Sequence, residues 1–160
     1  MEAVFGVVER ISTWMQAISC TALTFVMLLT VTDVGLRLLG HPIVGTYEIV
    51  GLVGALVIAF AIPITSWIRG HIFVDFFYLK CPKPVQDGLN IATRVVSIAL
   101  FLAIGWNMFA VAGDLYAAGE VTLTRHLPFY PIAYGLGACC FMECFVLLCD
   151  IVKVIGGKYE

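Results

Sequence analysis

Three sets of residues in this sequence have types that could carry out chemistry: an acid within an apolar stretch, six cysteines and three histidines. The acid is Glu143, the one formal charge in the apolar run 127–149. An acid at membrane depth costs free energy and often belongs to a proton or ion pathway. The alternative is a structural role, in which the carboxylate pairs with Arg94, a backbone group or another subunit. We favour pairing and retain the relay as the alternative.

The six cysteines would suggest a membrane thiol oxidoreductase if they formed reactive pairs. Such chemistry usually needs a Cys-x-x-Cys pair in an exposed, electropositive setting. Here four cysteines lie within residues 139–149, and the others are Cys20 and Cys81. Neither of the two loops predicted below to lie outside the cell contains a cysteine. We therefore interpret them as small apolar packing residues.

The three histidines, His41, His71 and His126, would suggest a haem or metal site if they shared a helix face. All three lie at the ends of apolar runs, and none is in the middle of a run on the same face as another. A haem-carrying bundle needs axial ligands inside its helices. The sequence therefore predicts no metal or haem ligand, no catalytic residue and no cofactor in this chain.

The composition indicates an integral membrane protein. Hydrophobic types make up 61% of the 160 residues and charged types 12%, and the mean hydropathy is +1.01. A soluble domain is about 25% charged, and one of this size buries only about 70% of its unfolded surface. The surplus apolar surface must therefore face lipid. This excludes a disordered chain, a nucleic-acid-binding protein and an ordinary soluble enzyme.

Four apolar runs are long enough to cross a hydrocarbon core about 30 Å thick, which takes about 20 residues of helix. Spanning segments must satisfy their own backbone hydrogen bonds, and these runs are about twice as long as barrel strands. We therefore predict an all-α integral membrane fold, with one four-helix domain over residues 1–160. The predicted spans are 11–32, 49–68, 95–113 and 127–149.

The distribution of Lys and Arg predicts the orientation of the helices. Seven of these nine residues lie in the N-terminus, the middle loop 69–94 and the C-terminal tail. Both termini and the middle loop are therefore expected in the cytoplasm. The stretch 72–79 is apolar but too short to span, which is typical of a segment lying in the membrane interface. Pro84 suits the first turn of a helix, so the third helix is expected to begin well before Val95.

Charged residues flank the first predicted outer turn. Asp33 and Arg37 are one helical turn apart and can pair locally. Arg37 could instead meet Glu48 across the short turn that contains Pro42 and Gly45. Glu48 begins the second span, where a negative charge suits the positive end of the helix. Either arrangement fixes a hairpin, and neither makes a substrate site.

The second span has small residues at every fourth position, Gly51, Ala55 and Ala59, between Tyr47 and Pro63. Small residues at this spacing let another helix approach closely, so we predict a helix-packing face. Proline inside a helix removes a backbone hydrogen bond, so Pro63 is expected to bend the inner end of this span.

Polar groups do not converge at the middle of the predicted spans. A transporter that acts alone usually has internal repeats, broken helices and polar groups at the membrane midplane. This sequence has one off-centre acid, together with Trp106 and Asn107 near the middle of the third span. We interpret these two as packing residues that need hydrogen-bond partners across helices. The chain is therefore expected to assist transport and not to carry solute itself.

The stretch Arg69-Gly70-His71-Ile72, followed by Val74-Asp75, comes directly after the second predicted span. With this motif, four spans and both ends in the cytoplasm, the chain resembles the small membrane subunit of tripartite ATP-independent periplasmic (TRAP) transporters, the DctQ family. The resemblance covers nearly the whole chain. Many relatives have tryptophan where this chain has Tyr47. Weaker markers are Arg37, Pro42, Glu48, Gly119-Glu120 and Leu127-Pro128.

The resemblance implies a transporter in the bacterial inner membrane with two protein partners. A large multispanning permease subunit (DctM-like) would carry the substrate and sodium sites, and a periplasmic solute-binding protein (DctP-like) would deliver an organic acid. The small subunit would contact lipid and brace the static scaffold of the permease while its transport domain moves. The residues expected to contact the permease or fix hairpins are Arg37, Glu48, Arg69, His71, Asp75 and Glu143.

Two other classes of protein remain as alternatives. A small proton-coupled exporter acting as a homo-oligomer would use Glu143, so Glu143→Gln would abolish its transport. A membrane redox enzyme would use the cysteines, and would lose its activity when all six are replaced. The absence of an internal repeat and the spread of the cysteines favour the transporter subunit over both.

Overall fold

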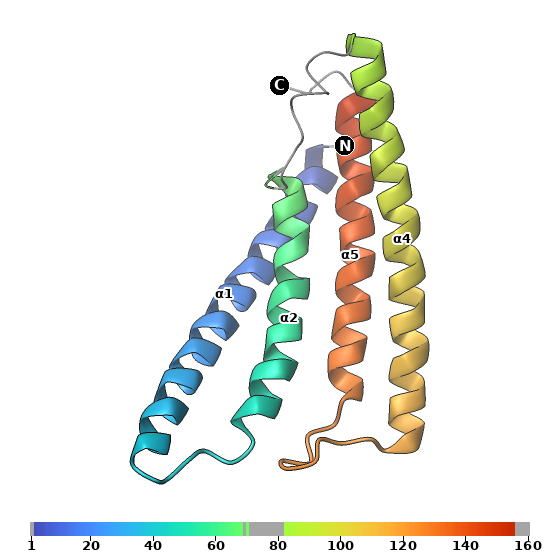
Figure 1. Cartoon of the computed structure of the whole chain (residues 1–160). Coiled ribbons are helices and arrows are strands. Elements are labelled where there is room, and N and C mark those ends of the chain that lie inside the picture. The colour runs from blue at the N-terminus through green and yellow to red at the C-terminus, as the bar shows by residue number, and fades with distance from the viewer. Residues whose placement is uncertain (1, 69, 71–81, 156–160) are drawn as a thin grey trace.

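The computed structural model describes residues 2–68, 70 and 82–155, and these residues form four long α-helices (Figure 1). All four are long and apolar enough to cross a membrane, which confirms the predicted all-α fold with four helices of spanning length for the part of the chain described. A single bridge between Val121 and Pro128 lies outside the helices. The helices are α1 (Glu2–Leu38), α2 (Thr46–Trp67), α4 (Lys83–Ala118) and α5 (Tyr130–Ile155).

The ends of the helices define two ends of the molecule. We call the end with the start of α1 and the end of α5 the terminal end, and the opposite end, with the α1–α2 turn and the α4–α5 loop, the hairpin end (Figure 1). Which end faces the cytoplasm stays a prediction from the charges. The predicted interfacial segment, 72–79, lies outside the described residues.

α4 begins well before the apolar run from which it was predicted. Pro82 precedes the helix in an extended conformation, and Pro84 lies in the first turn. The first N–H groups of a helix have no partner within it, so proline at this position removes no hydrogen bond. At the other end, Gly119 adopts the left-handed conformation, with φ 65°, and its N–H bonds the carbonyl of Tyr116. This conformation favours glycine and ends the helix.

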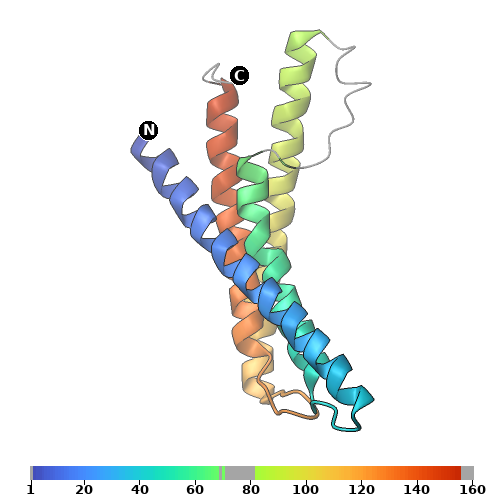
Figure 2. The same ribbon diagram turned by 90° about the vertical axis from the view of Figure 1, so that its left-hand side faces the viewer.

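The four helices form an open row in the order α1, α2, α5, α4 and do not close into a bundle. α1 packs on α2, α2 on α5 and α5 on α4, while α1 reaches α5 at only a few residues. In a closed four-helix bundle, each helix packs against two neighbours along its length. α1 also crosses the other helices obliquely (Figure 2). Long faces of α1 and α4, at the two edges of the row, are therefore left without a neighbour among the described residues.

The core lies along α5. About 39% of the spanning window of α5 is buried, against 11% in α1 and in α4. Cys139, Cys144 and Val146 are among its buried side chains. All five described cysteines are free thiols, and those on α5 contribute to packing. A central helix in a row is covered on two sides, which explains why α5 is the most buried.

Glycines bring α5 close to its two neighbours. A methyl group added at Gly137 would lie 2.7 Å from two ring carbons of Phe109 on α4, and one at Gly105 would lie 3.3 Å from Cβ of Cys140. On the other side, Gly135 leaves room for Leu56 of α2, whose Cδ2 would lie 3.2 Å from an added methyl group. Small residues at helix interfaces allow this close approach in membranes.

The small-residue face predicted on α2 is packed only toward the terminal end. Gly51 is exposed, and nothing among the described residues lies within 4 Å of a methyl group added there. Ala55 is half-buried, whereas Ala59 and Pro63 are buried. The close contact expected at Gly51 is therefore not made within the described chain. The glycines that set helix spacing lie on α4 and α5 instead.

We predict that Gly137→Ala lowers the free energy of unfolding by about 1–3 kcal/mol, the usual cost of overpacking. The added methyl group would press against the Phe109 ring, which also packs on Tyr134 and Phe141. Thermal unfolding of the chain in mild detergent measures the change. Gly113→Ala is the matched control, because nothing lies within 4 Å of its new methyl group. Equal melting temperatures of the two variants would contradict the close approach of α4 and α5.

Candidate functional site

The candidate residues that the structure describes lie in two polar clusters, one at each end of the row. At the hairpin end, Asp33 fixes the α1–α2 turn. The Nε of Arg37 donates a hydrogen bond to Asp33 Oδ2 at 2.8 Å, and the backbone N–H of Ile43 donates to Oδ1 at 2.8 Å. Asp33 is buried, while the Arg37 side chain is 60% exposed. The expected local pair is present, and its acid also holds the start of the returning chain.

Glu48 connects the two loops of the hairpin end. Its Oε1 accepts a hydrogen bond from the N–H of Thr124 at 2.7 Å, and its Oε2 accepts one from the N–H of Arg125 at 3.0 Å. The Nε of Arg125 donates to the carbonyl of Val44 at 2.8 Å. The alternative of a pair between Arg37 and Glu48 is therefore wrong, because the backbone of the α4–α5 loop takes both oxygens of Glu48. These bonds join residues far apart in the sequence.

The α1–α2 turn passes very close to the α4–α5 loop at Gly45. Its φ of 86° is in the left-handed region, and a methyl group added there would lie 2.5 Å from Cγ of Arg125. Both observations favour glycine at this position. The loop itself is closed by Thr122, whose N–H donates to the carbonyl of Leu127 at 2.9 Å and whose Oγ1 accepts from the N–H of Leu127 at 3.0 Å. Hydrogen bonds and close packing therefore join the α1–α2 turn to the α4–α5 loop at the hairpin end.

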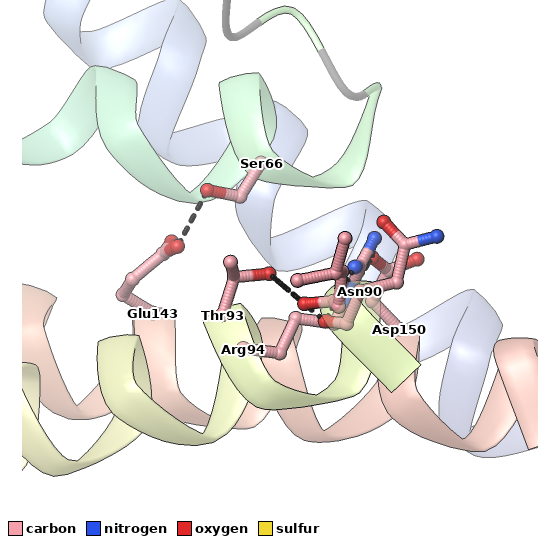
Figure 3. A network of polar contacts seen from close by, with 7 residues as sticks. Ser66, Asn90, Thr93, Arg94, Glu143 and Asp150 are labelled. Carbon is pink, nitrogen blue, oxygen red and sulfur yellow. Dashed lines mark hydrogen bonds and ion pairs between the residues drawn. The ribbon is translucent and has the colours of Figure 1, made fainter. Parts of the chain in front are cut away.

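Toward the terminal end, a buried ion pair joins α4 to α5 (Figure 3). The Nε of Arg94 donates to Asp150 Oδ2 at 2.6 Å, and its Nη2 lies 2.5 Å from the same oxygen. The Nη1 of Arg94 also donates to the carbonyl of Asn90 at 2.9 Å. The Arg94 and Asp150 side chains are 9% and 10% exposed. Arg94, one of the partners expected for Glu143, is thus engaged by Asp150.

Glu143 lies inside the fold and joins α5 to α2. It is 1% exposed, and its Oε1 accepts a hydrogen bond from Ser66 Oγ at 2.5 Å (Figure 3). Its Oε2 has no hydrogen-bond partner among the described residues. The expected partners were Arg94, a backbone group or another subunit. Within the described residues, a serine side chain on the neighbouring helix makes the contact instead. A contact between Glu143 and another subunit stays a prediction.

A cluster of aromatic rings and one cation links three helices at the terminal end. The Nζ of Lys153 on α5 lies 3.3 Å from the centroid of the Trp67 ring on α2 and 5.5 Å from that of Phe5 on α1. The two ring centroids are 6.4 Å apart. A cation over an aromatic face is attracted by the electron density of the ring. This contact ties the start of α1 to α2 and α5.

The arrangement connects helices and gathers no reacting groups within the part of the chain described. Three of the predicted residues, Arg69, His71 and Asp75, lie outside the described residues, so their contacts stay predictions. Among the described residues, no group of three or more His, Cys, Asp or Glu side chains could hold a metal ion. Sequence reasoning missed Ser66 and Asp150. Asp150 directly follows the last apolar run, and Ser66 is one of the few polar residues in the second span.

Comparison with known proteins gave one family. The family model described as tripartite ATP-independent periplasmic transporters, DctQ component, matches residues 26–157. No curated protein matches the chain. The matched region includes the last third of α1 and the whole of the other three helices. Both polar clusters described above therefore lie within it.

We predict that Glu48→Gln loosens the contact between the two loops of the hairpin end. A carboxylate has two acceptor oxygens and a neutral amide has one, so one of the N–H groups of Thr124 and Arg125 loses its partner. Hydrogen-exchange mass spectrometry of the α4–α5 loop should show faster exchange. The control is Glu120→Gln in the same loop, since its side chain makes no hydrogen bond within the described residues. Unchanged exchange in Glu48→Gln would contradict the bridging role.

A double-mutant cycle tests the buried ion pair. We predict that Arg94→Leu alone destabilises the chain by about 3–5 kcal/mol, because it removes the cation that pairs with the buried Asp150 charge. The double variant Arg94→Leu with Asp150→Leu should be more stable than either single variant. Unfolding in detergent measures all four proteins. If the effects of the two single changes simply add, the two residues are not coupled and the assignment of this pair fails.

Proposed function

Because the chain belongs to the DctQ component family of tripartite ATP-independent periplasmic transporters, we propose that it braces the large permease subunit of such a transporter. It is a transporter component with four helices suited to a membrane, and the family is not an enzyme family. The observation that supports bracing most directly is the open row of helices. Its four members are tied together by polar and glycine contacts, while both edges are left uncovered.

A brace must keep its shape, and the contacts at both ends of the row serve this purpose. Glu48 holds the two loops together at the hairpin end. The Arg94–Asp150 ion pair and the contact between Ser66 and Glu143 tie α5 to α4 and to α2 toward the terminal end. Breaking the two buried contacts within a membrane leaves polar groups without water to replace their partners. These ties therefore resist sliding of one helix along the next.

The lengths of the helices also suit this role. α1 has 37 residues and α4 has 36, so each is about 55 Å long at 1.5 Å per residue. The hydrocarbon core is about 30 Å thick, so helices of this length tilt or extend beyond it. Long tilted helices can contact a large partner over its full depth. A substrate site in this chain is not needed for that function.

In the proposed complex, the chain is a multi-pass protein of the bacterial inner membrane with both termini in the cytoplasm. The excess of Lys and Arg in the termini and the middle loop supports this orientation. The large DctM-like subunit would hold the substrate and sodium sites. A periplasmic DctP-like protein would deliver an organic acid to it. Sodium coupling and the class of solute follow from the family resemblance.

Gentle detergent extraction followed by mass analysis tests this proposal. We predict that the tagged chain co-purifies with one large hydrophobic subunit in a one-to-one ratio, because an uncovered edge of the row is free to pack against a protein neighbour. Extraction in a harsher detergent, which should separate the two proteins, is the control for specific association. Recovery of a homo-oligomer with no second membrane protein would contradict the proposed function.

Replacing Glu143 separates a structural role from a role in coupling. We predict that Glu143→Gln supports solute uptake by the complete transporter within about twofold of the wild type, because an amide oxygen can still accept the Ser66 hydrogen bond. Uptake is measured per assembled complex in membrane vesicles. Glu143→Leu, which removes the acceptor, should lower the amount of assembled complex instead. Normal assembly of Glu143→Gln without uptake would contradict the structural role.

A further inference from the structure

One long face of α4 points away from the rest of the row. Arg94 and Gly105 face α5, and the buried Ala112 continues that side of the helix. An α-helix turns 100° per residue, so the positions about half a turn away lie on the opposite side. All of them are exposed, and most are small. We call this set the outer α4 face: Val96, Ala99, Ala103, Asn107, Ala110 and Asp114.

Asn107 is the polar residue near the middle of this face. It lies four positions from the centre of the spanning segment Gly88–Ala118, about 6 Å along the helix axis. Its side chain is exposed and has no hydrogen-bond partner within the described residues. A side-chain amide has two donors and an acceptor, and lipid tails satisfy none of them. This position therefore needs a polar neighbour from outside the chain.

Exposed threonines on α1 differ from Asn107 in this respect. Thr21, Thr24 and Thr30 each donate a hydrogen bond to the carbonyl four residues earlier in their own helix, at 2.8–2.9 Å. Their hydroxyl groups are satisfied, so these parts of α1 can face lipid. α1 also has an exposed amide without a hydrogen-bond partner among the described residues, Gln16. It lies about 8 Å along the helix axis from the centre of the segment Phe5–Leu38, so Asn107 is the exposed amide nearer to the centre of its span.

We propose that the outer α4 face binds a membrane-spanning helix of the large permease subunit, with a hydrogen bond to the side chain of Asn107. The proposal rests on the proposed function, which provides that partner. Alanines on either side of Asn107 let a second helix approach closely enough for this bond. Asp114, on the same face nearer the hairpin end, adds a negative charge that favours a Lys or Arg on the partner helix.

The charge on Asp114 also argues against a second copy of this chain. In a two-fold pair of parallel α4 helices, the same face of each copy would meet the other. Asp114 would then lie opposite its own copy, and like charges at short distance repel. A helix of the large subunit has no such restriction. It can carry a donor opposite Asn107 and a positive charge opposite Asp114.

Site-specific photo-crosslinking identifies what covers this face. A benzophenone amino acid replaces Ala103 in the chain, which is expressed together with the tagged large permease subunit from the same genome. The control places it at Leu102, which is at the same depth but 100° around the helix and 44% exposed. We expect a covalent adduct with the large subunit from position 103 and at least fivefold less from position 102.

Three outcomes would overturn the proposal: adducts from position 103 with a second copy of the chain, adducts with lipid alone, or equal yields from both positions. Failure of the proposed function itself would give a different result. In that case the wild-type chain does not co-purify with the large subunit at all. If the two proteins co-purify but position 103 gives no adduct with the large subunit, the proposed function stands and the assigned face is wrong.

Substitution of Asn107 measures the hydrogen bond itself. Interhelical hydrogen bonds in membranes predict that Asn107→Leu weakens the complex by about 3- to 20-fold. Asn107→Gln, which keeps the amide, should restore part of this loss. The melting temperature of the chain alone should not fall in Asn107→Leu, because Asn107 makes no hydrogen bond within it. Equal affinity of the Leu variant and the wild type for the large subunit would overturn the role of Asn107.

Discussion

A polar group placed at membrane depth cannot rely on water, so it must find its partner within protein. In the described structure, most of the buried polar side chains have such a partner. Arg94 pairs with Asp150, and Ser66 donates to Glu143. Each contact joins two helices, so satisfying the polar groups also fixes the order of the helices in the row. Glycines such as Gly137 then set how closely those helices approach.

The same constraint explains why the chain is suited to a partner. A row of four helices covers its central helix but leaves the outer faces of α1 and α4 exposed. Where an exposed face is apolar or satisfies its own hydroxyl groups, lipid can cover it. Where it presents an unpaired amide, as at Asn107, lipid cannot. A protein with this arrangement has the features of one component of a larger membrane assembly.

The number of helices could be predicted from the sequence, whereas their contacts could not. Apolar runs of this length can cross a membrane only as helices, so four runs predict four helices. Pro84 correctly predicted that α4 begins before its apolar run. Partner choice depends on which faces meet. Glu143 bonds Ser66 because α2 and α5 are neighbours in space, and Glu48 reaches backbone groups more than 70 positions away. Neither pairing follows from local spacing, and the expected small-residue face around Gly51 was not where the described helices meet most closely.

Solute uptake into vesicles of defined protein content tests most directly whether this chain is a structural partner and not a carrier. Vesicles with the large permease subunit, this chain, the binding protein and a sodium gradient are predicted to accumulate an organic acid. Omitting this chain should abolish most of that uptake, and vesicles containing this chain alone should accumulate no more than protein-free vesicles. Accumulation by the chain alone would contradict the account.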